Sequence, residues 1–512
     1  SSPMAEPRQT IVIGAGMAGL SAALRLAHEG HRVTVIERAH APGGKLHTQW
    51  VHGAAIDSGP TVFTMRWVFD ALLRSVGTRL EDHVRLSPLS VLARHFWYDG
   101  SSLDLFADAE QSEAAIADWA GGAEAQRFRR FCARTRQIYD TLEGPFMRAP
   151  RPNPWQLVTR MGLRGLGTLA QLGPMRTLWQ QMQHEFADPR LRQLFARYAT
   201  YCGSSPWQAP ATLMLVAQVE MDGVWSLEGG MTALSDMLAR LARQHGATLR
   251  MGSTAQRIDV RNGRVCGVEL LGGEYLPADQ VLFNGEASAL REGLLGPVTT
   301  TAVPEQAPPR SLSAVTWAMH APLSGVALER HNVFFCPDYQ QEFDDIFVHR
   351  RLPTLPTVYV CAQDRPDPVQ VGAPERVLML VNAPASGDAP SWRDEDLDTC
   401  QATTFSYLNC LGLRMPFSNP GMRRNSPVDF HRRFPASGGA LYGQATHGWT
   451  SIFSRPGSQT PVQGLYLAGG SVHPGPGVPM AALSGQLAAE AMLANPVSTR
   501  RSRLVATSGG MS

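Results

Sequence analysis

The chain lacks several features that commonly reveal function. It has a single lysine, Lys45, and a formal net charge of only +2, which gives no case for nucleic acid as a partner. Its seven cysteines are scattered without a Cys-x-x-Cys motif, which argues against a disulfide framework or a zinc site and favours reduced thiols in the cytoplasm. We see no secretory leader before the first predicted strand. No apolar run reaches the ~18 residues that a membrane-spanning helix needs.

What the chain does have is a glycine motif at its first predicted strand. Residues 11–13 are apolar and lead directly into Gly-x-Gly-x-x-Gly at residues 14–19. Gly14 permits a tight turn, Gly16 lets the backbone approach a pyrophosphate, and Gly19 lets the following helix pack closely on the strand. This motif alone is weak evidence for a bound dinucleotide, so the segments that flank it must be considered.

The surroundings complete a dinucleotide-binding unit. A helical pattern follows the glycines and stops at Gly30, and residues 33–36 form a second predicted strand that ends at Glu37. The Glu37 carboxylate is placed to accept hydrogen bonds from a ribose diol, with Arg38 beside it. We expect the N–H groups of Met17 and Ala18, at the helix N-terminus, to face the phosphates. These features predict a bound dinucleotide and leave FAD and NAD open.

Two further turns follow this unit. Gly43-Gly44 predicts a loop that passes close to another group, and the Lys45 cation is suited to a diphosphate. The alternative is a solvated lysine after a turn. Residues 57–61, Asp-Ser-Gly-Pro-Thr, offer backbone groups and a turn that could face a flat ring.

Together these motifs resemble the superfamily of FAD-containing amine oxidases and carotenoid desaturases. The resemblance implies FAD as the cofactor, and it places the Asp-x-Gly-Pro-Thr segment near the flavin. A second segment contacts the adenine, and Ala255 stands there where valine is common. The last segment, residues 464–480, resembles the C-terminal FAD motif of bacterial carotenoid desaturases, with a helix expected near Ala481. The implied cofactor-binding residues are Gly14, Gly16, Met17, Ala18, Gly19, Glu37, Arg38, Gly44, Lys45, Gly59, Pro60, Thr61, Ala255, Gly470, Ser471, Val478, Pro479 and Met480.

The sequence pattern and the resemblance predict an α/β fold. It comprises a Rossmann-like FAD-binding domain, an interleaved mixed α+β substrate domain and a helical membrane-facing region. The FAD-binding domain is assigned to residues 8–66, 218–300 and 456–495, the helical region to 67–217 and a strand-rich substrate domain to 301–455. Apolar stripes at helical spacing, such as Phe128, Phe131, Ile138 and Leu142, support the helical assignment. We expect the tail, residues 496–512, to be disordered.

Residues 151–200 are basic, with seven arginines and two acidic residues. A basic segment with Trp, Leu and Met suits a membrane interface. It equally suits ordinary core helices whose arginines face water, so the residues alone leave both open. A substrate dissolved in lipid favours the membrane, and we therefore expect a cytoplasmic protein that associates peripherally with the inner or photosynthetic membrane of a bacterium.

Within the superfamily, phytoene desaturases generally have glycine where this chain has Met480. The segment from Thr61 to Phe106 is similar to the hydroxyneurosporene desaturases. That resemblance implies hydride transfer to FAD and a new C3–C4 double bond in an acyclic 1-hydroxycarotenoid. The sequence leaves the electron acceptor open between oxygen, a quinone and a carotenoid partner. A terminal hydroxyl needs a polar partner, which we place at the far end of an apolar tunnel. The candidates for it are Arg66, Arg94, His95 and Trp97, each with surface or packing roles as the alternative.

His473 lies in the predicted flavin loop and is a candidate proton acceptor, against the alternative of a hydrogen-bonded loop histidine. Other functions stay open. The chain could act as a phytoene or neurosporene desaturase or a carotene isomerase. It could be an amine oxidase, although its C-terminal flavin motif has no cysteine for covalent attachment. It could also bind isoprenoids without redox chemistry, like GDP dissociation inhibitors of small GTPases; the intact cofactor motifs argue against this.

Overall fold

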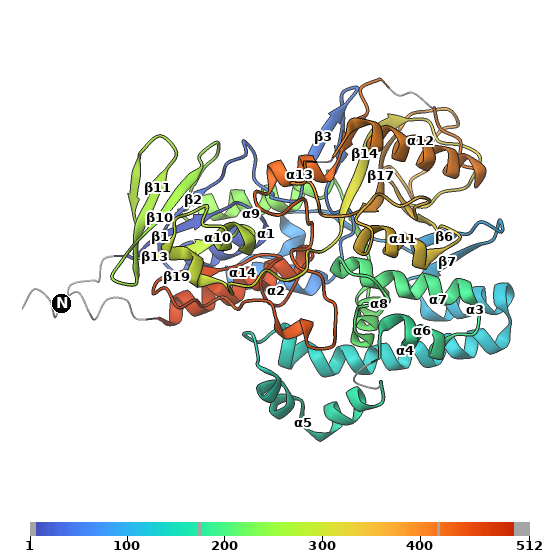
Figure 1. Ribbon diagram of the computed structural model, residues 1–512, viewed down its shortest axis with the longest axis horizontal. Helices are drawn as coiled ribbons and strands as arrows, with labels where there is room; N and C mark the ends of the chain where they lie inside the picture. Colours follow the sequence, from blue (N-terminus) through green and yellow to red (C-terminus); the bar gives the residue numbers. More distant parts are fainter. Residues whose placement is uncertain (1–6, 173–175, 391, 417–419, 496–512) are drawn as a thin grey trace, which may run out of the picture.

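The computed structural model describes residues 7–172, 176–390, 392–416 and 420–495. A dinucleotide-binding lobe lies at the left of Figure 1, a lobe built on a large sheet at the upper right, and a helical region beneath it. The tail at residues 496–512, for which we predicted disorder, lies outside the described residues.

The dinucleotide-binding lobe is built on a five-stranded parallel sheet in the order β19-β13-β1-β2-β9. Its strands come from all three predicted FAD-binding segments, which are far apart in the sequence. They are β1 (Gln9–Ile13), β2 (Arg32–Ile36), β9 (Thr248–Arg250), β13 (Gln280–Phe283) and β19 (Leu465–Leu467). The turn after β1, the segment after β13 and the loop after β19 therefore meet at the carboxyl edge of one sheet, where open α/β sheets bind their ligands.

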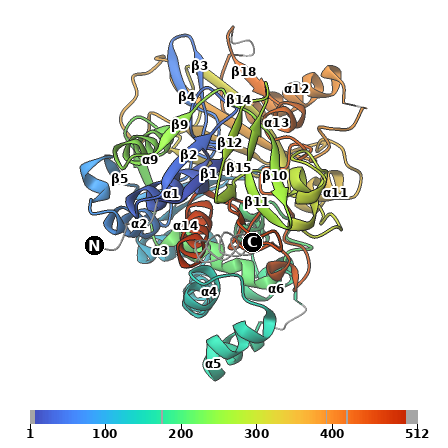
Figure 2. The ribbon, with the colours of Figure 1, turned by 90° about the vertical axis from the view of Figure 1, so that its left-hand side faces the viewer.

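Alternate residues of these strands point to two cores, as the two-residue period of a strand requires. Val12 packs on one face of the sheet and Ile11 on the other. The Val12 face is covered by α1 (Met17–His28), α2 (Arg66–Ser75), α9 (Thr232–Gln244) and α14 (Val478–Ala494). The Ile11 face is covered by α10 (Ala287–Arg291) and by a sheet of β10 (Ala255–Arg261), β11 (Arg264–Leu270) and β12 (Tyr275–Pro277). Figure 2 shows these two sides of the parallel sheet.

The last helix begins earlier than we expected. It starts at Val478, not near Ala481, because Pro479 stands in its first turn, where a residue without an N–H loses no hydrogen bond. Val478, Pro479 and Met480 thus form the helix N-terminus itself.

The second lobe contains a seven-stranded sheet in the order β18-β14-β17-β16-β15-β6-β7. The strands are β6 (Val91–Phe96), β7 (Ser102–Phe106), β14 (Ser313–Ala321), β15 (His331–Phe334), β16 (Val358–Ala362), β17 (Glu375–Ala383) and β18 (Arg423–Asn425). A hairpin of β3 (Thr48–Val51) and β4 (Ala54–Asp57) reaches this sheet from the first FAD-binding segment. Near it lie α11 (Tyr339–Phe347), α12 (Asp394–Cys410) and α13 (Pro427–Arg433).

The expectation that residues 67–217 are helical is wrong for β6 and β7. These strands lie inside that range, but β6 pairs with β15 and β7 pairs with β6, so residues 91–106 belong to the large sheet. Period-two alternation over so short a stretch was masked by the helical stripes on either side. Two short strands, β5 (Leu86–Pro88) and β8 (Trp225–Leu227), also pair with each other.

The rest of that range is helical, as predicted. It contains α3 (Ala109–Ala120), α4 (Gly122–Leu142), α5 (Pro154–Ala170), α6 (Leu178–Glu185), α7 (Pro189–Ala196) and α8 (Leu215–Met221). The predicted stripe of Phe128, Phe131, Ile138 and Leu142 is buried in the core of this region. Short helical turns, η1 (Leu80–Asp82), η2 (Glu143–Met147), η3 (Arg197–Cys202), η4 (Ala211–Met214), η5 (Val298–Ala302) and η6 (Ser451–Phe453), connect the larger elements.

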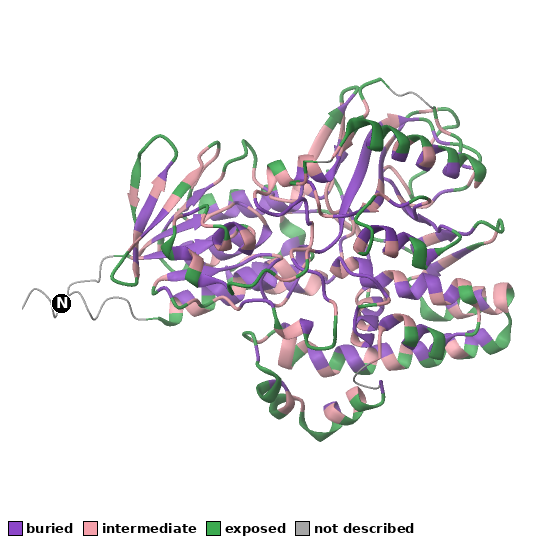
Figure 3. Cartoon of the chain, in the orientation of Figure 1, coloured by how far each residue is buried: buried purple, intermediate pink, exposed green. Residues whose placement is uncertain are grey.

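One helix of this region stands apart from the body of the protein. In Figure 3 α5 projects below the rest of the helical region and is mostly exposed; only Leu157 and Gly165 are buried along it. Across the described part of the chain, the helices are too short or too polar to span a bilayer.

Candidate functional site

The glycine turn after β1 is built so that no side chain fits. A Cβ atom at Gly14 would lie 2.6 Å from the Asn284 carbonyl oxygen, and one at Gly19 would lie 2.1 Å from the Gly14 carbonyl oxygen. At Gly16 it would meet the Asn284 side-chain amide at 2.9 Å. Gly14 also has a φ of +106°, in the region that favours glycine. The bare backbone that results leaves room for a ligand to approach the start of α1.

The N-terminus of α1 has donors to offer such a ligand. Gly16 caps the helix and has no side chain with which to bind the first N–H groups. Within the described residues, the N–H groups of Met17 and Ala18 have no hydrogen-bond acceptor. Unpaired N–H groups and the positive end of the helix dipole form a site suited to a phosphate anion.

Glu37 closes the turn from the other side. Its carboxylate accepts hydrogen bonds from the N–H groups of Ala15 (2.7 Å) and Ala39 (3.2 Å), while Arg38 is exposed next to it. The N–H of Ser253 donates to the Glu37 carbonyl at 2.8 Å, which brings the start of β10, and with it Ala255, to the end of β2. The ribose and adenine positions implied by the sequence therefore lie side by side.

A second layer of glycines packs on the first turn. A Cβ atom at Gly44 would lie 2.9 Å from the Cα of Gly16, and one at Gly59 would lie 1.9 Å from the Lys45 carbonyl oxygen. Asp57 anchors the segment that contains Gly59, Pro60 and Thr61. Its buried carboxylate accepts from the Met231 N–H at 2.9 Å, and its backbone exchanges two hydrogen bonds with the Gln363 amide, at 2.9 and 2.8 Å. Burial raises the pKa of Asp57.

Lys45 joins this layer to the loop after β19. Its Nζ lies 3.2 Å from Glu286 Oε1 and donates to the Leu441 carbonyl at 2.8 Å. Ser471 accepts at Oγ from the Ala287 N–H at 3.1 Å. Lys45 is thus partly neutralised by a carboxylate, and its contact with a diphosphate remains a prediction.

Two side chains at the meeting of the segments could not be singled out from the sequence. The first is Asn284, which follows β13. With its amide oriented to satisfy its neighbours, it accepts from the N–H groups of Gly19 (2.9 Å) and Gly16 (3.2 Å) and donates to the Ala468 carbonyl (3.1 Å). It therefore joins all three FAD-binding segments. A polar residue directly after a buried parallel strand was the available signal.

Arg455 is the second residue that was missed. It is buried and donates to the carbonyls of Gly470 (2.6 Å), Tyr442 (3.1 Å) and Gln444 (3.0 Å), which fixes the loop containing Gly470 and Ser471. Burial lowers its pKa to about 10. Arg455 precedes the C-terminal motif by several residues, and no local pattern singles it out.

His473 is buried beside the helical region. Its Nε2 donates to the Ala149 carbonyl at 2.9 Å, and its ring meets the Phe146 ring edge-on, with centroids 4.8 Å apart. Burial lowers the pKa of His473 to about 4, so the ring is neutral at pH 7. Because Nε2 carries the proton, the lone pair is on Nδ1; a role as proton acceptor stays a prediction.

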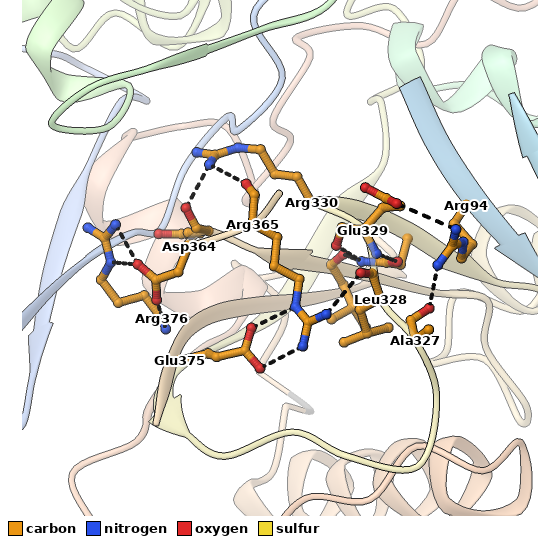
Figure 4. Close-up of polar contacts among 12 residues, drawn as sticks. Arg94, Ala327, Leu328, Glu329, Arg330, Asp364, Arg365, Glu375 and Arg376 are labelled. Carbon is orange, nitrogen blue, oxygen red and sulfur yellow. Dashed lines mark hydrogen bonds and ion pairs between the residues drawn. The ribbon is translucent and has the colours of Figure 1, made fainter. Parts of the chain in front are cut away.

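The structure separates the four residues predicted to bind the terminal hydroxyl. Arg66 is engaged by Asp70, at 3.3 Å, and by Glu81 on the surface of α2. Arg94 makes two 2.7 Å hydrogen bonds to Asp104. Figure 4 shows Arg94 also bound to Glu329 and to the Ala327 carbonyl, next to the Arg365–Glu375 and Arg376–Asp364 ion pairs. Both arginines thus already have partners.

His95 and Trp97 point from the opposite face of β6 towards the helical region. His95 is buried, stacks on Phe335 with ring centroids 6.0 Å apart, and donates from Nδ1 to the Leu103 carbonyl at 3.1 Å. Burial lowers the pKa of His95 to about 3. Trp97 stacks on Phe335 and packs at a tilt against Trp119. This face contributes to the apolar interior between the large sheet and the helices.

Comparison with known proteins decides the family. The family model "Flavin containing amine oxidoreductase" matches residues 17–493. The chain belongs to this family. The hydroxyneurosporene desaturase of Rubrivivax gelatinosus is 54% identical, over 99% of this chain and 98% of that protein, and that of Cereibacter sphaeroides is 44% identical, over 96% and 99%. A solved oxidoreductase of Methanosarcina mazei shares the fold, with a TM-score of 0.59 at 17% identity over 93% of this chain and 99% of that one.

The site fits the cofactor of this family. The protein is an FAD-dependent oxidoreductase, and the glycine layers, the free N–H groups of α1 and the Glu37 carboxylate suit the two phosphates and the ribose of FAD. When bound, FAD supplies an acceptor for a hydride. The position of the segment from Asp57 to Thr61 near the flavin stays a prediction.

Proposed function

We propose that the protein is a carotenoid desaturase that introduces the C3–C4 double bond into an acyclic 1-hydroxycarotenoid of the 1-hydroxyneurosporene type. The observation that carries this proposal is the 54% identity to a hydroxyneurosporene desaturase along 99% of the chain. The site adds chemical support, because removing hydride next to a conjugated polyene leaves a delocalised cation and so needs little acid–base machinery.

The residues of this chain would orient the substrate and exclude water. His95, Trp97 and Phe335 pack in an apolar, aromatic interior, whose chemical character suits a long polyene. One hydride leaves one carbon of the reacting bond and a proton leaves its neighbour. His473, neutral and with its lone pair on Nδ1, is a candidate to receive that proton. We assign Lys45, Arg38 and the N-terminus of α14, from Val478 to Met480, to cofactor binding.

The substrate can be tested directly. Purified enzyme is given 1-hydroxyneurosporene, neurosporene or phytoene in detergent micelles, with oxygen or a quinone as the electron acceptor, and the carotenoid absorption maximum is followed. The proposal expects the maximum of 1-hydroxyneurosporene to move to longer wavelength, because conjugation lengthens. Reaction with phytoene alone would contradict it, and so would peroxide formation with amines in place of carotenoids.

We further propose that α5 docks on the surface of the bacterial inner or photosynthetic membrane, where such a substrate is dissolved. Trp155 and Leu163 of this helix have exposed fractions of 74% and 89%, and Arg160 and Arg164 are exposed beside them. Exposed apolar side chains bordered by arginine suit the interface of an anionic bilayer.

Flotation with anionic vesicles tests this docking. We expect the wild type to float with the vesicles and the double variant Trp155→Ser/Leu163→Ser to remain largely in the lower fractions. Trp50→Ser is the matched control, because Trp50 is 63% exposed on β3, far from α5 in Figure 1. Equal flotation of the double variant and the control would exclude α5 as the docking element.

A further inference from the structure

A group of polar and aromatic side chains lies inside the protein, where the helical region meets the large sheet. Arg197, the first residue of η3, places its guanidinium over the rings of Tyr201 and Tyr359, 5.6 and 5.7 Å from their centroids. Glu220 of α8 accepts hydrogen bonds from the hydroxyls of Tyr198 (3.0 Å) and Tyr201 (2.7 Å). Burial raises the pKa of both tyrosines. We call Arg197, Tyr198, Tyr201, Glu220 and Tyr359 the arginine cluster.

The Arg197 guanidinium has donors to spare. No carboxylate oxygen among the described residues lies within ion-pairing distance of it. Arg197, Tyr201 and Tyr359 also keep some solvent-accessible surface although protein surrounds them. Accessible surface on side chains this deep means that they border an interior space. Glu220 stabilises this cation electrostatically without a direct ion pair. Guanidinium N–H groups that lack an acceptor are still costly inside a protein, which favours a ligand that accepts their hydrogen bonds.

The arginine cluster is joined to the segment near the flavin. The Tyr359 hydroxyl lies 2.8 Å from Thr61 Oγ1 and 2.6 Å from His331 Nδ1. His331 Nε2 and the Tyr339 hydroxyl are buried, and neither has a hydrogen-bond partner in the described structure. Buried polar atoms without partners are rare in folded proteins. The unpartnered atoms of His331 and Tyr339 therefore indicate that a polar group of a ligand binds beside them.

The chemistry of the proposed substrate says where its hydroxyl must lie. The hydroxyl is on C1, and only C2 separates that carbon from the C3–C4 bond that is oxidised. The group that binds the hydroxyl must therefore lie close to the reacting end, next to Thr61, and not at the far end of a tunnel as the sequence suggested. Arg66 and Arg94 have other partners, whereas the Arg197 guanidinium has no ion pair among the described residues, and its cluster is connected to Thr61 through Tyr359.

We propose that Arg197, held between Tyr201 and Tyr359, donates a hydrogen bond to the substrate's 1-hydroxyl oxygen and so selects hydroxylated carotenoid ends over hydrocarbon ends. This inference rests on the proposed function. A hydrocarbon end would fill the same space and leave the guanidinium without an acceptor. Sites built to bind a hydroxyl reject the analogue that lacks it more strongly than a purely apolar pocket can.

The test compares the binding of two carotenoids that differ in the hydroxyl. The holoenzyme is reduced with dithionite, so that it binds without turnover, and the dissociation constants of 1-hydroxyneurosporene and neurosporene are measured by quenching of tryptophan fluorescence. We expect the wild type to bind the hydroxylated carotenoid about 10- to 100-fold more tightly. In Arg197→Leu we expect the two constants to become equal within about threefold, with FAD content unchanged.

Arg192→Leu is the matched control, since Arg192 of α7 donates to the Phe186 carbonyl at 2.7 Å and lies outside the arginine cluster. Arg192→Leu should still bind 1-hydroxyneurosporene more tightly than neurosporene. If Arg197→Leu does not fold, Arg197→Lys decides, because a compact ammonium cannot reproduce the planar donor set and should lose most of the preference. Full preference in the folded leucine variant, or in the lysine variant, would overturn the inference.

Two outcomes separate this inference from the proposed function. A wild type that desaturates both carotenoids and binds them equally would leave the desaturase proposal standing and overturn the role of Arg197. A wild type that desaturates neither would overturn the proposed function itself. A variant with an intact preference but a lower kcat would show that the arginine cluster acts in proton transfer and not in binding, which also overturns the inference.

Discussion

The two lobes of the protein create their binding surfaces in opposite ways. The dinucleotide-binding lobe works by leaving side chains out: Gly14, Gly19 and Gly59 let backbone approach backbone at distances that no Cβ would tolerate. The other lobe works by adding large polar side chains, with Arg197 and Tyr359 brought together from η3 and β16. Bare backbone shapes the predicted cofactor site, with the Glu37 and Lys45 side chains beside it, whereas we propose that side chains set the choice of substrate.

The two lobes also differ in how they respond to change. A contact between backbone atoms cannot be rebuilt by another rotamer, so a single added methyl group must move a strand or a helix. The arginine cluster contains long side chains that can move. A substitution there should change the preference for hydroxylated carotenoids without disrupting the fold. Single substitutions in each lobe can test this difference.

The largest effect is expected from Gly19→Ala. Its Cβ would lie 2.1 Å from the Gly14 carbonyl oxygen, so α1 must shift away from the turn and the phosphate site must open. Overpacking of this kind costs about 1–3 kcal/mol, and we expect FAD affinity, measured by fluorescence titration of the apoprotein, to fall by about 100-fold. Gly122→Ala is the control, because no atom lies within 4 Å of its added Cβ. Unchanged FAD affinity in Gly19→Ala would contradict the claim that the dinucleotide-binding lobe depends on close backbone contacts.

The next effect concerns His473, which joins the dinucleotide-binding lobe to the helical region through Ala149. Its pKa is about 4 in the folded protein and 6.5 in the unfolded chain, so the unfolded state binds more protons between these values. The free energy of unfolding should therefore fall as the pH falls from 6.5 towards 4, by about 2 kcal/mol from this group.

Denaturation of wild type and His473→Gln at several pH values measures this contribution. The variant should show a shallower loss of stability over the same pH range, while the two proteins should have parallel slopes above pH 7. Parallel slopes throughout would mean that His473 titrates normally in the folded protein.

A smaller effect is expected from Asn284→Ala. It removes the acceptor for the N–H groups of Gly16 and Gly19, and a net hydrogen bond contributes about 1 kcal/mol, so FAD affinity should fall by about tenfold. Asn409→Ala on the exposed face of α12 is the control. An effect of Asn284→Ala as large as that of Gly19→Ala would show that side chains matter as much as the bare backbone in this lobe.

The dinucleotide-binding lobe was also easier to predict from the sequence than the other lobe. The strand, turn and helix around Gly14 to Gly19 are local, so period and glycine spacing were enough to place them. Asn284 could be seen only as the end of a strand, because its partners Gly16 and Ala468 come from distant segments.

The other lobe was harder to predict. The strands β6 and β7 were taken as part of a helical region, because β15, the strand that joins their hairpin to the large sheet, lies more than 200 residues later. Arg94 was a candidate for the substrate hydroxyl, and its pairing with Asp104 depends on that missed hairpin. The arginine cluster is formed by residues of η3, α8 and β16 and contacts Thr61, and no spacing in the sequence shows that these segments meet.

The most direct test of the account is one anaerobic turnover. The oxidised holoenzyme is mixed with 1-hydroxyneurosporene without oxygen or a quinone, and the flavin and carotenoid bands are recorded together. The account predicts that the flavin bleaches while the carotenoid band moves to longer wavelength, in equal amounts. A flavin that stays oxidised with this carotenoid but bleaches with an amine would contradict it.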